Sequence, residues 1–131
     1  MAATALLFLG FMPSYAGAAE DGTPLGSALK FSAGIVSGFL IHEGSHALVA
    51  RLTNTDLHWE TGTLNQPIAF TENANTDSKG FAISSAGLIS QAAGAEIILR
   101  VDKIDKNDAF VQGMMTWDIL NPILYSLDYW I

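Results

Sequence analysis

Hydrophobic residues form three long runs in the sequence, and each run is long enough for a membrane-spanning helix. The runs cover residues 24–52, 80–101 and 108–131. Each reaches the ~20 residues that cross the hydrocarbon core of a bilayer. Polar residues interrupt all three runs, and because such residues are costly against lipid, we expect them to face one another inside a helix bundle.

The ends of the runs and the segments between them carry signals of their own. Thr23 is suited to cap the first helix, with Pro24 at its first position, and Asp108 is suited to cap the third. The polar segment 53–79 contains "LHWETG" and "QPIAFTE", which predict two short strands joined by a turn at "GTLN". The short link 102–107 predicts that the second and third helices are antiparallel neighbours. We therefore expect a mainly α fold: a polytopic membrane helix bundle with three core spans and a short β-hairpin insert.

The N-terminal residues 1–19 predict a signal peptide or a retained N-terminal anchor. An apolar core, "ALLFLGFM", is followed by the small residues "AGA" before Ala19. The sequence leaves both possibilities open. The 131 residues suffice for one domain, which we place at residues 20–131.

Composition supports a location in the lipid bilayer. Only 15% of the residues are charged and the mean hydropathy is +0.30, whereas soluble domains carry about 25% charged residues. A net charge of −7 argues against a nucleic-acid partner. The chain has no cysteine, so a metal could be held only by His, Asp or Glu. The orientation in the membrane stays open, because a cleaved signal and the distribution of Lys and Arg favour opposite answers.

Residues that recur every three or four positions predict the inner faces of the helices. The first helix carries a row of two glycines and two histidines: Gly34, Gly38, His42 and His46. Its G-x-x-x-G pattern lets another helix backbone come close, and a small-residue row on the second helix could meet it: Ala86, Ser90 and Gly94. The third helix has a polar stripe: Asp118, Asn121, Tyr125 and Asp128.

The segment "HEGSH", residues 42–46, is the strongest chemical signal in the chain. His42 and His46 lie four residues apart, so one helix presents both imidazoles to a single Zn²⁺. Glu43 is then placed to act as the catalytic base that takes a proton from a water molecule activated by the zinc. Catalytic zinc needs a third protein ligand, either a carboxylate or His58. The alternative is a pair of buried histidines that only satisfy hydrogen bonds.

Three motifs resemble those of the site-2 protease type of intramembrane zinc metalloprotease. The family's H-E-x-G-H, A-G-P-L-A-N and N-x-x-P…L-D-G motifs are similar to "HEGSH" (42–46), "AGLISQ" (86–91) and "NPILYSLDYW" (121–130). They occur in the family's order, one on each predicted span. Five features depart from the family pattern. The glycine of the first motif is shifted to Gly44, and Leu88, Gln91 and Tyr129 replace the proline and asparagine of the second motif and the glycine of the third. Asn121 is followed at once by Pro122.

The resemblance also bears on the third zinc ligand. If the first helix starts at Pro24 and the third at Asp108, Asp128 lies at nearly the depth of His46, and Asp118 lies more than two turns short of it. A later start of the first helix makes the two aspartates comparable. The resemblance then favours Asp128, which follows Leu127 in the L-D pair, and it leaves Asn121, Asp118 and Gln91 as residues that orient the zinc ligands or the substrate.

The resemblance implies an intramembrane zinc metalloprotease that hydrolyses peptide bonds of membrane-embedded peptide or protein substrates. We expect an integral membrane protein of the bacterial inner (plasma) membrane, with residues 20–131 as a metalloprotease-like domain. The alternative is a non-catalytic membrane subunit or pseudoprotease, whose polar helix faces pack against membrane partner subunits or hold a structural metal.

Overall fold

The computed structural model describes residues 23–59, 68–70 and 77–130, and it describes the side chains of residues 23–56 and 78–127. Three helices dominate it: α2 (Pro24–Leu52), α3 (Asp77–Arg100) and α4 (Ala109–Trp130). Two strands, β1 (Leu57–Trp59) and β2 (Ile68–Phe70), pair antiparallel between α2 and α3. The expected signal or anchor, residues 1–19, and the turn expected between the two strands lie outside the described residues.

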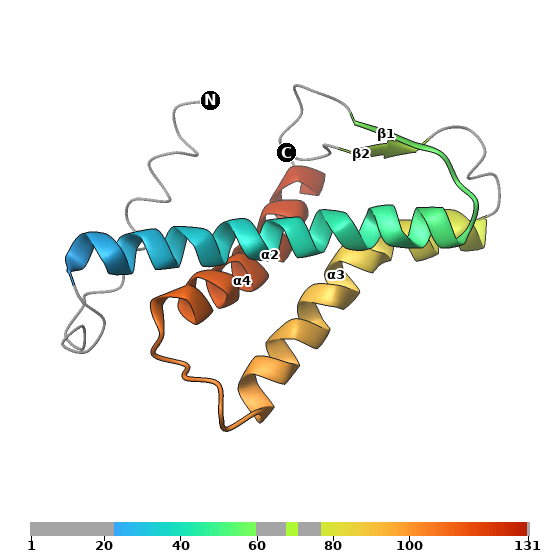
Figure 1. The fold of residues 1–131 in the computed structure, drawn as a ribbon. Coiled ribbons are helices and arrows are strands. Elements are labelled where there is room, and N and C mark those ends of the chain that lie inside the picture. Colours follow the sequence, from blue (N-terminus) through green and yellow to red (C-terminus); the bar gives the residue numbers. More distant parts are fainter. Residues whose placement is uncertain (1–22, 60–67, 71–76, 131) are drawn as a thin grey trace.

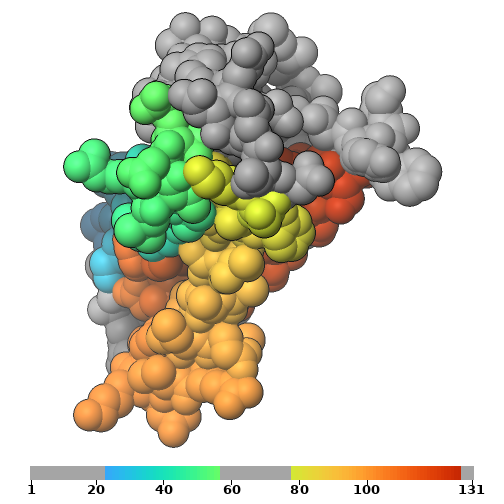
Figure 2. All heavy atoms as spheres, turned by 90° about the vertical axis from the view of Figure 1, so that its right-hand side faces the viewer, coloured from blue at the N-terminus to red at the C-terminus, as the bar shows by residue number. Residues whose placement is uncertain are grey.

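Helix α2 is the element on which the other two helices pack. Both α3 and α4 contact α2 far more than they contact each other. Figure 1 shows the two helices leaving α2 in different directions. In Figure 2 the C-terminal half of α3 and the loop after it extend away from the rest of the molecule. The short link predicted that α3 and α4 are antiparallel neighbours; they do contact each other, but far less than either contacts α2.

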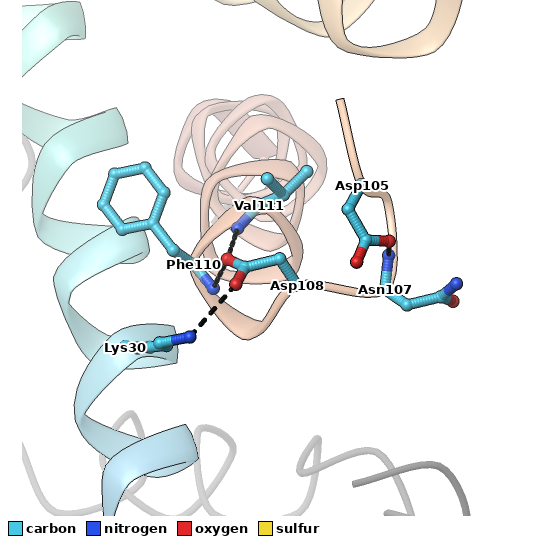
Figure 3. A network of polar contacts seen from close by, with 6 residues as sticks. All are labelled: Lys30, Asp105, Asn107, Asp108, Phe110 and Val111. Atoms are coloured by element: carbon cyan, nitrogen blue, oxygen red, sulfur yellow. Dashed lines mark hydrogen bonds and ion pairs between the residues drawn. The ribbon is translucent and has the colours of Figure 1, made fainter. Parts of the chain in front are cut away.

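The starts of α2 and α4 follow the predicted caps. The Thr23 hydroxyl accepts a hydrogen bond from the Gly26 amide, and Pro24 occupies the first helical position. At α4, one carboxylate oxygen of Asp108 accepts hydrogen bonds from the backbone amides of Phe110 and Val111, at 2.8 and 3.4 Å (Figure 3). Each cap satisfies amides that the first turn of a helix leaves without partners.

Asp108 also ties the start of α4 to α2. Its second carboxylate oxygen lies 3.3 Å from the Lys30 ammonium group, which projects from α2 toward the cap (Figure 3). Burial acts to raise the pKa of Asp108, but the amide hydrogen bonds and Lys30 outweigh it and hold that pKa below its usual value. The start of α4 is therefore level with Lys30, more than one turn along α2.

A row of close contacts spaced by one helical turn joins α2 to α4, and we call it the α2–α4 ladder. A Cβ at Gly34 would lie 2.1 Å from the Phe110 carbonyl oxygen, and one at Gly113 would lie 2.0 Å from the Phe31 carbonyl oxygen. One turn further along, a Cβ at Gly38 would lie 2.8 Å from the Trp117 side chain. The Gly34–Gly38 groove is thus a packing contact, but α4 fills it rather than the small-residue row expected on α3.

Adding one methyl group at Gly34 should therefore disrupt the bundle. In Gly34→Ala the methyl group would collide with the backbone of α4, which cannot move aside as a side chain can. We expect a loss of about 1–3 kcal/mol in the free energy of unfolding, measured by denaturant titration in detergent micelles. The matched control is Gly44→Ala on the same helix, where a Cβ meets nothing within 4 Å. Equal stability of the two variants would contradict the ladder.

The burial pattern is inverted relative to a soluble protein. Five polar side chains that lie between the helices are buried: His42, Glu43, His46, Gln91 and Asn121. Large apolar side chains face outward on all three helices, among them Leu40, Phe81 and Ile119. Within the described residues, α2 and Ser78–Arg100 of α3 are long and apolar enough to cross a membrane, judged by length and composition alone. The third expected span, α4, does not meet that criterion over its described residues.

Candidate metal centre

His42 and His46 lie on consecutive turns of α2, on the face that α3 and α4 cover. Their side chains are buried, with 1% of His42 and 8% of His46 exposed. The two rings meet edge to face with their centroids 4.8 Å apart. Their Nε2 atoms lie 3.1 Å from each other. Two nitrogens bound at about 2.0–2.1 Å to one tetrahedral zinc would be about 3.3 Å apart, so the spacing fits a shared ion.

The outer ring nitrogens show which atoms are left for a metal. His46 Nδ1 lies 2.6 Å from the Ile83 carbonyl oxygen, which can only accept a hydrogen bond, so His46 donates from Nδ1. His42 Nδ1 lies 2.8 Å from Gln91 Oε1 and donates to it in the same way. Neutral rings with protonated Nδ1 atoms carry lone pairs on both Nε2 atoms. Two lone pairs that face each other are suited to bind one cation.

Gly87 of α3 leaves room for a cation beside the two nitrogens. A Cβ at this position would lie 2.5 Å from Nε2 of His42 and 2.5 Å from Nε2 of His46. That point is equidistant from the two Nε2 atoms and lies 2.4 Å from Cε1 of His42, so it marks space beside the two rings and not the place of a bound ion. Because Gly87 has no side chain, α3 can approach the histidines without filling this position.

Two amide side chains close the site from α3 and α4. Asn121 Nδ2 donates a hydrogen bond of 2.9 Å to Gln91 Oε1 and lies 3.2 Å from His42 Nδ1. Both amides are buried. The structure thus brings together four of the residues selected from sequence: His42, His46, Gln91 and Asn121. Such hydrogen bonds to the outer nitrogen of a metal-binding histidine fix its tautomer and its ring orientation.

Glu43 and Tyr125 lie at the open side of the site. Glu43 is buried and lies within electrostatic range of His46 and of Tyr125. The Tyr125 ring is tilted over His42, with the two centroids 6.0 Å apart. Glu43 is thus near the histidine pair, and among the described residues it takes no part in the hydrogen bonds that join His42, Gln91 and Asn121. A catalytic base needs such a free carboxylate near the metal ligands.

The described side chains do not complete a group of three metal-binding residues. Within residues 23–56 and 78–127, no third His, Asp or Glu joins the histidine pair in a metal-binding group. The side chains of Asp128 and His58 lie outside the described ones. The Asp118 side chain is half-buried and interacts with Gln91.

Asp128 remains nearer than Asp118 to the level of His46, but by less than expected. Contacts pair Gly34 with Gly113 and His42 with Asn121, so the two helices run in the same direction. Helix α4 begins level with Lys30, more than one turn after the start of α2. At this offset the midpoint of the histidine pair lies about midway between the levels of Asp118 and Asp128. Measured from this midpoint, depth does not separate the two aspartates.

Sequence reasoning missed Gly87 and Ile83, which face the histidines from α3. With Gln91 they form a row at four-residue spacing: Ile83, Gly87 and Gln91. The row that we expected to face α2 was the neighbouring row of small residues, Ala86, Ser90 and Gly94. A Cβ at Gly94 meets nothing within 4 Å, so this end of the row has no close neighbour. The polar Gln91 within an apolar helix was the signal that marks the inner face.

Comparisons with known proteins give no relative for this chain. A scan of protein-family models, a search of curated proteins and a search of solved structures each found no match. The geometry of the site is therefore the basis for proposing a function.

Proposed function

We propose that this chain is a membrane-embedded zinc metalloprotease that hydrolyses peptide bonds of membrane-embedded substrates. The observation that carries the proposal is the pair of Nε2 atoms 3.1 Å apart, beside a position kept open by Gly87. The two atoms are also within hydrogen-bond distance of each other, but a shared hydrogen bond would require a proton on one Nε2 atom. Here both rings direct their protons outward to Ile83 and Gln91, as ligand histidines do.

His42 and His46 would hold the zinc ion, with a third ligand for which we propose Asp128. A zinc ion bound there supplies Lewis-acid activation of water and of the scissile carbonyl group. Glu43 accepts the proton of the attacking water and then delivers it to the leaving amine. Its burial beside the ligands keeps bulk water away from this transfer.

The inverted burial supports the membrane part of the proposal. Polar groups are gathered between the helices and apolar side chains face outward, which suits a lipid environment better than water. We propose that α4 crosses the membrane with α2 and α3, because it is paired with α2 along the ladder. We also propose the bacterial inner membrane as the location, on the resemblance alone.

Zinc binding by two aspartate variants tests the ligand assignment. We expect the zinc affinity of Asp128→Ala to fall by more than the 10–100-fold typical of residues that hydrogen-bond to metal ligands, because this change removes one of three protein–metal bonds. We expect Asp118→Ala to keep one zinc per chain at saturating concentration. The measurement is metal content and affinity of the purified proteins in detergent. Loss of zinc from Asp118→Ala together with its retention in Asp128→Ala would show that the assignment is reversed.

A further inference from the structure

Gln91 joins α3 to groups of both other helices. It projects from α3, and only 4% of it is exposed. Its Oε1 accepts two hydrogen bonds, from His42 Nδ1 on α2 and from Asn121 Nδ2 on α4. These use both lone pairs of the oxygen. Its Nε2 is buried and makes no hydrogen bond, while the Asp118 carboxylate of α4 lies near enough to interact with Gln91.

We propose that Asp118 is a positioning residue that acts on His42 through Gln91, by holding the Gln91 amide with its oxygen toward the imidazole. The proposal rests on the proposed zinc site, because the orientation of that amide determines which nitrogen of His42 is free to bind metal.

The reason is the asymmetry of the amide group. With Oε1 toward the ring, His42 must donate from Nδ1, and its Nε2 keeps a lone pair for the metal. If the amide turned by half a rotation, Nε2 of Gln91 would face the ring and His42 Nδ1 would have to accept. The proton would then sit on His42 Nε2, at the atom that is to bind zinc. The two amide orientations therefore correspond to a ring that can bind metal and a ring that cannot.

A carboxylate is suited to select between these orientations. Ionised Asp118 can only accept hydrogen bonds, so it favours the orientation that directs the Gln91 NH₂ group toward it. Asn121 cannot make this selection alone, because it can turn its own amide and satisfy either orientation of Gln91. The unpartnered Nε2 is the donor that Asp118 would attract, and burial makes an unused donor costly.

The first test is Asp118→Asn, which keeps the size of the side chain and replaces the acceptor by a group that can both donate and accept. In the metal-free protein, ¹⁵N NMR of His42 should show the Nδ1–H tautomer in the wild type and a rise of the Nε2–H tautomer in the variant. Zinc affinity should fall about 10–100-fold, as for other partners of ligand histidines. The control is Glu96→Gln, which removes an exposed carboxylate paired with Arg100 at the far end of α3.

A double-mutant cycle tests whether the effect passes through Gln91. Once Gln91→Leu has removed the amide, adding Asp118→Asn should cause no further loss of zinc affinity. Additive losses would overturn the proposal, since Asp118 would then act independently of Gln91. An unchanged His42 tautomer in Asp118→Asn would also overturn it. Failure of the wild type to bind zinc would instead contradict the proposed function, and the tautomer measurement on metal-free protein would still decide the role of Asp118.

Discussion

Glu43→Gln should abolish peptide-bond hydrolysis while leaving zinc bound. Glutamine has nearly the shape of glutamate and leaves both imidazoles in place, but it cannot accept a proton at neutral pH. Loss of a general base typically costs about 10²–10⁴-fold in rate. Metal content and cleavage of a helical membrane substrate should be measured on the same preparation.

Other outcomes of the Glu43→Gln experiment would change the assignment of Glu43. Cleavage at the wild-type rate would remove Glu43 from the mechanism, and loss of zinc would make Glu43 a ligand. If the wild type itself binds zinc without cleaving a range of substrates, the chain is the non-catalytic membrane subunit that the sequence also allows.

Gly87→Ala should lose zinc although it changes no ligand. The added methyl group would lie 2.5 Å from both Nε2 atoms and 2.4 Å from Cε1 of His42, so the two rings could not keep the positions from which they would share an ion. We expect zinc affinity to fall by about 100-fold or more, at the upper end of the effects of residues that only support ligands. Zinc titration monitored by a competing chelator gives the affinity, and circular dichroism checks that the helices remain.

The control for this variant is Gly94→Ala on the same helix. Its Cβ meets nothing within 4 Å, and the exchange of glycine for alanine has the same intrinsic effect on helix formation at both positions. Zinc affinities that match in the two variants would show that the ion, if bound, does not lie beside Gly87.

Local signals in the sequence predicted the helices well. Thr23 and Asp108 cap the helices they were expected to cap, since a cap needs only a few adjacent residues. The inner face of α2 was also correct, because the glycine and histidine row follows directly from the helical repeat. These features depend on spacing within one helix.

The relations between helices were not predictable in the same way. The Gly34–Gly38 groove could accept small residues from either of the other helices. Helix α4 fills it through Gly113, and the spacing of residues in the sequence did not distinguish Gly113 from other glycines. The offset of the two helices follows from the contacts between them along the ladder, which no local pattern reveals. Gly87 escaped notice because a glycine in a membrane helix is common, and its role depends on side chains of another helix.

The α2–α4 ladder has a consequence for how the two helices slide against each other. Trp117 is its one bulky member, and its ring meets Phe39 edge to face at 5.5 Å between centroids. A shift by one turn toward Gly34 would force the indole between backbones that already touch, and the opposite shift would drive it into His42. Either slip would move Asn121 by about 5.4 Å relative to His42. Trp117 therefore sets how the two histidines of α2 align with Asn121 of α4, although it makes no hydrogen bond to any of them.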